Sequence, residues 1–363
     1  MSFQSATSSN HVKFLGLATI LVCIWFMYTI PSTSQYHLTS GSSLGSSKTG
    51  PLDLLPLAEA KDYCLARRWE PYPHRQGRRK IYDLMLINTE LEWLEIRMGQ
   101  MGDQVDYFVI LEAANTFTDE PKPLYVRENW ARFKKYHHKM ILHTLETEHA
   151  EFTDTWSRER FSRNAMYDQV IPKLTGEQEA FMGDVIIVSD VDEIPRPDAL
   201  KALRNCDFPK EVTLHTKMFY YGFQWLKRDD WPHPQATFYN NEETVLPSDL
   251  RNSHGANLYN AGWHCSYCFS TVAEMVTKIK SFSHKELDKP EFTDIDKIVH
   301  RVRSGKDMFD RENEQFDRVE DNPDVPQFLL KHKDTYNYLL NRDPPNANFV
   351  DYTPPAENDV TEA

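Results

Sequence analysis

Asp190 and Asp192 stand one residue apart, directly after the β-branched run at residues 185–188. An uninterrupted apolar run of this length is typical of a strand covered on both faces. Pro195 and Pro197 prevent that strand from continuing. Both carboxylates are therefore expected at the carboxyl end of a central strand, where open α/β sheets bind ligands. Such a pair suits Mg²⁺ or Mn²⁺ bridging to a diphosphate. The pattern predicts a metal-dependent enzyme that uses a nucleotide sugar.

The same spacing occurs a second time, at Asp294 and Asp296. There the apolar residues Ile295, Ile298 and Val299 recur at helical intervals, which indicates the solvated face of an amphipathic helix. Context rather than spacing separates the two pairs. The alternative for the first pair is a loop or helix-capping motif without metal.

The elements around the first pair alternate between strands and helices. Strands are predicted at 80–87, 107–111 and 139–145, and helices at 90–101 and 158–174, before the strand that begins at Val185. This rhythm predicts an α/β fold with a mostly parallel central sheet and helices on both faces. Later strands at 212–226 and 263–269 are expected to be mixed in direction. Helices at 272–282 and 294–303 follow them.

Other polar residues follow the predicted strands closely. Asn88 and Glu90 end the first strand and Glu112 ends the second, so all three are expected to face the same crevice and to bond the base and ribose of a donor. The alternative is an ordinary turn or cap. Arg158 and Arg163 on the helix before the metal strand are candidates for phosphate binding, against the alternative of solvated surface arginines.

Two further residues are candidates for chemistry at the metal. Glu193 follows the acidic pair and is predicted to orient metal-bound water or the donor sugar; otherwise it is a helix-start carboxylate. His264 is a candidate third metal ligand, because neutral imidazole joins carboxylates on Mn²⁺. Its alternative is a hydrogen-bonded core histidine. The sequence does not rank the candidates for a general base, which are Asp229, Asp230 and Glu243.

Residues 14–30 form an unbroken apolar run preceded by Lys13. We expect it to be an uncleaved signal anchor rather than a cleaved signal peptide or a core helix, since no small-residue cleavage site follows. Lys13 then places residues 1–13 in the cytoplasm. Residues 31–78 are predicted to be a luminal stem, 79–343 the catalytic domain and 344–363 a disordered acidic tail.

Charge and cysteine content limit the partners and the compartment. The net charge is −13 and no basic cluster carries interleaved aromatics, which argues against nucleic acid as a partner. The cysteines beyond the apolar run would lie in an oxidising lumen, where structural disulfides are favoured over a zinc or redox site. Their connectivity stays open; they are Cys64, Cys206, Cys265 and Cys268.

Five segments resemble glycosyltransferase family 17 in the order in which that family carries them. They are LINTELEWLEIR, DYFVILEAANTFTDEPKPL, GDVIIVSDVDEIP, FYYGFQW and AGWHCSYCF. The likeness runs from about Tyr82 to about Arg311 and weakly on to Leu340. The best-known members are β-1,4-mannosyl-glycoprotein 4-β-N-acetylglucosaminyltransferases, which add a bisecting GlcNAc to N-glycans.

The resemblance implies a GT-A-like fold, UDP-GlcNAc as donor, a divalent cation, a glycoprotein N-glycan acceptor and a single-pass type II Golgi membrane protein. It places Asp190 and Asp192 at the family's metal and diphosphate motif, and it implies inversion at the anomeric carbon. Two other classes stay open. A haloacid-dehalogenase-type phosphatase also begins with an aspartate pair, although Ile194 stands where that class has threonine. A membrane-tethered glycan-binding protein without turnover is the other.

Overall fold

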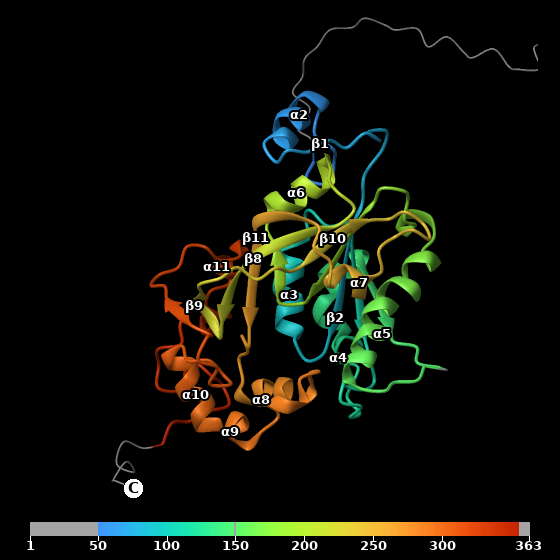
Figure 1. Cartoon of the computed structure of the whole chain (residues 1–363). Coiled ribbons are helices and arrows are strands. Elements are labelled where there is room, and N and C mark those ends of the chain that lie inside the picture. The colour runs from blue at the N-terminus through green and yellow to red at the C-terminus, as the bar shows by residue number, and fades with distance from the viewer. Residues whose placement is uncertain (1–49, 149, 356–363) are drawn as a thin grey trace, which may run out of the picture. The chain divides into compact units, whose positions relative to one another are not determined.

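The computed structural model describes residues 50–148 and 150–355, so the apolar run at 14–30 and residues 356–363 lie outside the described residues. The described chain forms one ten-stranded sheet with helices on both faces (Figure 1). This confirms the predicted α/β class. No helix in the described ranges is long and apolar enough to cross a membrane.

The first half of the sheet is parallel. Its strands stand in the order β5-β2-β3-β4, and each neighbouring pair is parallel. Helix α3 packs on the face that carries Met85, whereas α5 packs on the face that carries Leu84. Alternate residues of one strand therefore reach two separate cores. The bounds are β2 Ile81–Ile87, α3 Leu91–Met101, β3 Tyr107–Glu112, β4 Met140–Thr144, α5 Thr155–Asp168 and β5 Val185–Asp190.

The second half of the sheet is mixed, and here the prediction of a mostly parallel sheet is wrong. Among the described strands only four of the nine pairings in this sheet are parallel. Strand β10 lies antiparallel between β5 and β8, and a tight turn at Tyr221, with φ 66°, reverses the chain from β8 into β9. The bounds are β6 Glu193–Pro195, β8 Val212–Tyr220, β9 Gly222–Lys227, β10 Gln235–Phe238, β11 Ala256–Ser266 and β12 Phe316–Arg318.

The strand directions bring many strand ends to one edge. Strand β8 runs the same way as β5, because both are antiparallel to β10, and β11 is parallel to β8. The carboxyl ends of β2, β3, β4, β5, β8 and β11 consequently share one edge, which we call the carboxyl edge. Helices α8 (Val272–Ser281), α9 (Pro290–Thr293) and α10 (Ile295–Ser304) lie beyond the ends of β8 and β11 in Figure 1. Helices α8 and α10 match the predictions closely.

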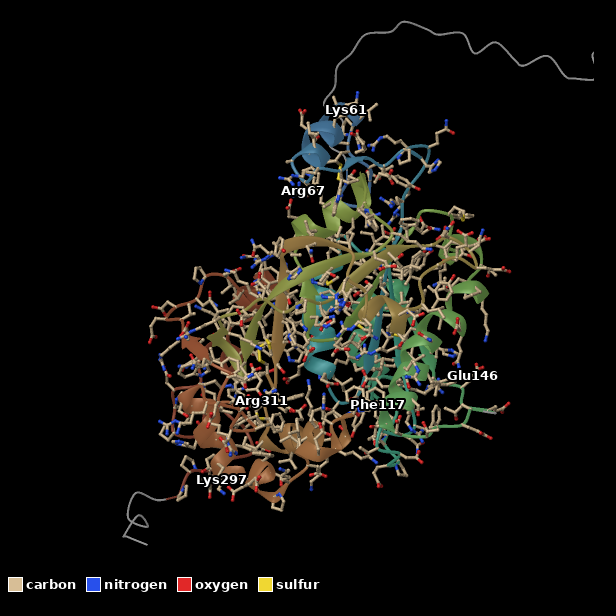
Figure 2. All side chains as sticks on the ribbon, viewed as in Figure 1. Lys61, Arg67, Phe117, Glu146, Lys297 and Arg311 are labelled. Atoms are coloured by element: carbon tan, nitrogen blue, oxygen red, sulfur yellow. A yellow bond between two sulfur atoms is a disulfide. The ribbon has the colours of Figure 1, made fainter. Side chains whose placement is uncertain are left out.

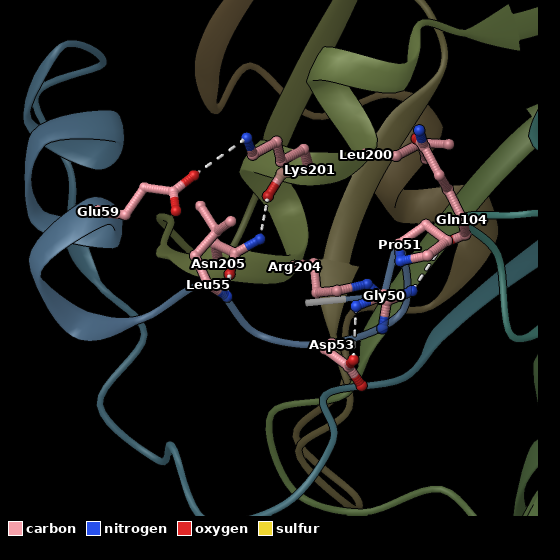
Figure 3. Close-up of a pocket in the computed structure, with 10 residues that line it drawn as sticks. All are labelled: Gly50, Pro51, Asp53, Leu55, Glu59, Gln104, Leu200, Lys201, Arg204 and Asn205. Atoms are coloured by element: carbon pink, nitrogen blue, oxygen red, sulfur yellow. Dashed lines mark hydrogen bonds and ion pairs between the residues drawn. The ribbon is translucent and has the colours of Figure 1, made fainter. Parts of the chain in front are cut away.

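The ordered unit begins earlier than the predicted stem boundary at residue 78. Helix α2 lies inside the predicted stem, yet the disulfide Cys64–Cys206 joins it to the end of α6, and β1 pairs with β7. A cavity of about 230 Å³ lies between residues 50–59 and α6, with Glu59 and Lys201 at its border (Figure 3). The bounds are α2 Leu57–Leu65, β1 Glu70–Pro71, α6 Pro197–Asn205 and β7 Cys206–Asp207.

The prediction of a disordered tail is also wrong for residues 344–355. The fully buried guanidinium of Arg342 donates to the carbonyls of Tyr221, Phe269 and Ala347. Buried Phe349 packs in the core beside α10. A buried cation holding three carbonyls fixes the segment that follows it. The remaining elements are α4 Tyr125–Glu128, η1 Trp130–Lys139, η2 Ile171–Lys173, η3 Gly176–Gln178, α7 Pro247–Arg251, η4 Lys285–Leu287, α11 Gln327–Lys331 and α12 Asn337–Leu340.

Candidate active site

Residues 190–193, which we call the acid loop, join β5 to β6 at the carboxyl edge. Asp190 ends β5, and the side chain of Glu193 accepts from the Asp190 amide at 2.9 Å. The Asp190 side chain is 40% exposed, whereas that of Asp192 is 6% exposed and that of Glu193 is fully buried. The loop therefore presents one carboxylate to solvent and holds two others inside.

Arg97 of α3 binds the backbone of the acid loop. Its fully buried guanidinium forms a two-pronged ion pair with buried Asp83, with both N···O distances 2.6 Å. It also donates to Ser189 Oγ at 2.6 Å and to the carbonyls of Asp190 and Glu193. A planar guanidinium donates in several fixed directions, so it fixes the loop backbone more firmly than a lysine would.

Two arginines pair with carboxylates of the acid loop. Arg163 Nη1 lies 2.9 Å from one Asp190 oxygen, and Arg251 Nη2 lies 3.2 Å from the other. Arg251 Nη1 also donates to Glu193 at 2.6 Å, and Trp231 Nε1 donates to the same carboxylate at 2.7 Å. The sequence prediction included Arg163 but missed Arg251, which comes from α7.

These arginines keep both carboxylates ionised. Burial raises the pKa of Glu193, but the Arg251 guanidinium outweighs it and lowers that pKa to about 2. Asp190 is only partly desolvated, since its side chain is 40% exposed, and the guanidinium groups of Arg163 and Arg251 together hold its pKa well below the usual range. An efficient general base has a pKa near the working pH. Neither carboxylate fits that role. Asp190, whose side chain is 40% exposed, is the one of the two that is open to a cation, because Glu193 is fully buried.

Arg251→Gln is expected to destabilise the protein most at neutral pH. A depressed folded-state pKa contributes stability above the unfolded value of Glu193, near 4.5, and this contribution is lost as pH falls toward 2. Without Arg251, Glu193 loses the largest influence that lowers its pKa, while burial and the Asp190 charge still raise it. The loss of unfolding free energy should therefore be largest near pH 7 and shrink between about pH 5 and pH 2. Urea unfolding of both proteins at pH 7, 5 and 3 measures it.

Arg228→Gln is the matched control, because its partner Asp317 is exposed. Exposed pairs contribute little, so this variant should differ little from the wild type at any of the three pH values. An Arg251→Gln effect that is constant from pH 7 to pH 3 would contradict the assigned pairing with Glu193.

Lys278 of α8 joins two strand ends. Its Nζ lies 3.1 Å from Asp192 Oδ2 and 4.0 Å from Glu90 Oε1, beyond β2. Burial lowers the pKa of Lys278, but the two carboxylates outweigh burial and raise it above the ordinary value. Asn88 also turns toward α8, where it donates to Ser281 Oγ at 2.8 Å. Helix α8, which was not predicted to be part of the site, thus joins the predicted residues after β2 to the acid loop.

His264 of β11 lies beside Asp192, with Nε2 3.7 Å from Oδ1. That distance exceeds a hydrogen bond. Its Nδ1 is buried and has no hydrogen-bond partner among the described residues. The imidazole therefore differs from the alternative of a hydrogen-bonded core histidine. The ring is only 6% exposed and tilts toward Trp231 at a centroid distance of 5.1 Å.

A second polar group lies where β2 and β3 end. Glu112 accepts from the Val126 amide through Oε2, while its Oε1 is buried without a partner in the described part of the chain. Lys122 Nζ and Thr89 Oγ1 are buried and likewise unpartnered there. Burial lowers the pKa of Lys122, and Glu90 and Glu112 oppose that shift. Buried polar atoms without partners are rare in folded proteins and indicate a ligand or ordered water.

The structure leaves some candidates apart from the acid loop. Arg158 pairs with Asp119 at 2.6 Å and lies over the ring of Phe152. Of the candidates for a general base, all are exposed, and Glu243 accepts from Asn240. In the described residues none of these three forms an ion pair or hydrogen bond with the acid loop; they are Asp229, Asp230 and Glu243.

The model of glycosyltransferase family 17 matches residues 8–344. The chain belongs to glycosyltransferase family 17. This confirms the resemblance carried by the five segments. A β-1,4-mannosyl-glycoprotein 4-β-N-acetylglucosaminyltransferase of Rattus norvegicus is 26% identical over 304 residues, 73% of this chain and 55% of that protein. The Homo sapiens enzyme of the same name is 25% identical over the same length and covers 73% of this chain and 56% of its own. The chain spans about half the length of these relatives.

Solved structures are similar only at low scores. A mannosyltransferase from Pyrobaculum calidifontis, in complex with GDP-Man and Mn²⁺, has a TM-score of 0.31 and 12% identity, covering 80% of this chain and 78% of its own. The inositol-1-phosphate CTP transferase of T. maritima has a TM-score of 0.28 and 11% identity, covering 53% of this chain and 86% of its own. At these scores neither likeness supports a conclusion.

Proposed function

We propose that the chain transfers N-acetylglucosamine from UDP-GlcNAc to a β-linked mannose of a glycoprotein N-glycan, forming a β-1,4 linkage. The observation that carries the proposal is the site in which the acid loop, Arg163, Arg251 and Lys278 meet at the carboxyl edge. Family membership and relatives named as N-acetylglucosaminyltransferases support it. We further propose that the chain works as a type II protein of the Golgi membrane.

The residues present fit a divalent cation. Asp192 Oδ1 and His264 Nε2 lie 3.7 Å apart, and two ligands of one ion, each at ~2.1 Å, lie at most about 4.2 Å apart. No three histidine, cysteine or acidic side chains gather as a complete metal site in the described ranges. Asp192 and His264 would therefore hold Mn²⁺ or Mg²⁺ only together with the diphosphate and water. Asp190, which pairs with Arg163 and Arg251 in this structure, is proposed as a further ligand. Bound there, the ion would neutralise charge on the leaving diphosphate.

The balance of charges at the site also favours a bound divalent cation. The carboxylates of the acid loop are already matched by Arg163, Arg251 and Lys278. An incoming diphosphate adds negative charge that these cations do not fully balance. Each of the three cations is held in place by two carboxylates, so it would position the diphosphate without losing its own orientation.

The unpartnered atoms near β2 and β3 support a nucleotide at this edge. Glu112 Oε1 accepts and Lys122 Nζ donates, which complements the N–H and C=O groups of a uracil. Asn88 and Glu90 lie between that place and the acid loop, where a ribose would lie. The α-linked donor and the β-linked product imply inversion, in which the acceptor hydroxyl attacks as the bond from C1 to UDP breaks.

UDP release from UDP-GlcNAc tests the proposal with the full-length chain in detergent. We expect slow release without acceptor, faster release with an N-glycan acceptor, loss of both with EDTA and recovery with Mn²⁺. NMR of the product should show a β-1,4 linkage to mannose. A coupled assay for UDP measures the rates.

The other classes predict different results in the same preparation. Glycan binding without UDP release under any metal condition would favour a binding protein without turnover. Phosphate release from a phosphomonoester would favour the phosphatase. Transfer that is indifferent to EDTA would refute the metal while leaving the transferase.

A further inference from the structure

His233 lies at the carboxyl edge, in the segment that leads into β10. Strand β10 is antiparallel to β5, and its first residue, Gln235, lies opposite Val188, two residues before β5 ends at Asp190. His233 Nδ1 lies 2.8 Å from Gln235 Oε1, so the imidazole stands next to Gln235 on the side of that end. Neighbouring strands of a sheet lie about 4.8 Å apart. The imidazole therefore lies beside the end of β5, where the acid loop begins.

Trp231 connects His233 to the acid loop. The ring centroids of Trp231 and His233 lie 5.0 Å apart, and the His233 amide donates to the Trp231 carbonyl at 2.9 Å. Trp231 Nε1 donates to Glu193 at 2.7 Å, and its ring also lies 5.1 Å from that of His264. One indole thus contacts both imidazoles and a carboxylate of the acid loop. His233 and the acid loop consequently border the same site.

A chain of hydrogen bonds fixes the tautomer of His233. Gln235, which is 1% exposed, donates through Nε2 to the Pro232 carbonyl at 2.8 Å. A carbonyl only accepts, so the amide oxygen of Gln235 is the atom that faces His233 Nδ1. Nδ1 then carries the proton, and Nε2 of the neutral ring keeps a lone pair. The side chain is half-buried, and Nε2 forms no hydrogen bond with any residue in the described ranges.

The charges around His233 favour the neutral ring. Burial lowers the pKa of His233 from its ordinary value of 6.5, and the Arg251 guanidinium lowers it further. The Glu193 carboxylate, the hydrogen bond to Gln235 and the Asp190 carboxylate oppose this shift without cancelling it. A general base has to be deprotonated at the working pH and still basic enough to take up a proton. A neutral imidazole meets both conditions, unlike the two carboxylates beside it.

His233 and the residues proposed to bind the nucleotide lie on opposite sides of the acid loop. In the sheet, β5 has β10 on one side and β2, followed by β3 and β4, on the other. Phe117 and Glu146, labelled in Figure 2, follow β3 and β4 and mark the nucleotide side. In an inverting displacement the acceptor hydroxyl approaches C1 from the side opposite the departing UDP. An acceptor that enters from the β10 side brings its hydroxyl to His233.

We propose that His233 is the general base of the transfer, an inference that rests on the proposed transferase function. Nε2 takes the proton of the acceptor mannose hydroxyl while the oxygen of that hydroxyl forms a bond to C1 of GlcNAc. The bond between C1 and the diphosphate oxygen breaks in the same step, and UDP leaves with the electron pair. The imidazolium then gives its proton to water, which restores the base. Gln235 is a positioning residue, because it accepts from Nδ1–H throughout.

His233→Asn and His233→Gln in the full-length chain test this role, because a side-chain amide takes up no proton near neutral pH. We expect each to lower kcat for transfer at least about 100-fold at saturating Mn²⁺. The KM values for donor and acceptor, and the affinity for UDP in calorimetric titration, should stay within about twofold of wild type. A loss confined to kcat reports an interaction made only in the transition state. Thermal unfolding confirms that the variants are folded.

The pH profile is a second readout that a structural role would not change. In the wild type, kcat/KM should fall as the pH drops below 6.5, because the imidazole becomes protonated and loses its lone pair. The residual rate of the two variants should lack this fall. Both profiles are measured at saturating Mn²⁺, so that loss of the metal at low pH does not contribute.

His215→Asn is the matched control. His215 is also half-buried and bonded to a side-chain amide, with Nε2 2.7 Å from Asn257 Oδ1, but it lies near the amino end of β8. Its transfer rate should equal that of the wild type. Folded His233 variants with near-normal kcat, or with an equal loss of UDP affinity, would overturn the assignment while leaving the transferase intact. A wild type that transfers GlcNAc to no glycan would instead refute the proposed function, and the role of His233 with it.

Discussion

Asp190→Asn is expected to lower the rate of GlcNAc transfer by about 100-fold, which corresponds to about 3 kcal/mol of transition-state stabilisation. The amide would replace a charged ligand of the proposed cation, which neutralises charge on the leaving diphosphate. Stability should change little, because Arg163 retains Glu159 and Arg251 retains Glu193. Initial rates with saturating donor, together with thermal unfolding, measure both effects.

The control is Asp296→Asn in the second acidic pair. Asp294 caps α10 and Asp296 is exposed, accepting from the Tyr352 hydroxyl at 2.7 Å. The substitution is chemically the same and the spacing is the same, but no change in the transfer rate is expected. Near-normal turnover in Asp190→Asn would show that Asp190 does not hold the cation.

Arg97→Met is expected to lower the free energy of unfolding by about 3–5 kcal/mol, because it leaves the buried Asp83 without its partner. The carbonyls of Asp190 and Glu193 lose a donor at the same time. Activity should therefore fall even under conditions in which the variant is folded. Urea unfolding measures the first effect, and initial rates below the unfolding transition measure the second.

Arg132→Met serves as the comparison for Arg97→Met. Arg132 pairs with Glu95 of the same helix α3, but both side chains are about one-third exposed. Such pairs contribute roughly 0–1 kcal/mol. Equal losses of stability in the two variants would show that burial of the Asp83 pair does not decide its contribution.

The sequence predicted the parts of the site whose signals are local. A β-branched run followed by prolines located β5 and the acid loop, and helical spacing located α8 and α10. Lys278 and Arg251 were missed because they stand 86 and 61 residues beyond their partners Asp192 and Asp190. No periodicity in one segment reports which residue of another segment will lie against it.

The errors in the predicted fold have similar causes. Strand β10 has four residues and no distinctive pattern, so nothing in the sequence placed it between β5 and β8. The segment after residue 343 has the composition of a disordered tail, yet it is held by Arg342. A charged residue fully enclosed by carbonyls contradicts the usual expectation for arginine, and only the folded structure shows it.

The disulfide Cys64–Cys206 joins two residues that are 142 positions apart in the sequence. The covalent loop that it closes contains β2, β5 and the acid loop. A protease that nicked the exposed stretch before β2 would thus leave two fragments still tethered. The clipped molecule would migrate as one species until a reductant split it. The bond also means that a force applied at Cys64 would be transmitted through the disulfide directly to Cys206, at the carboxyl end of α6.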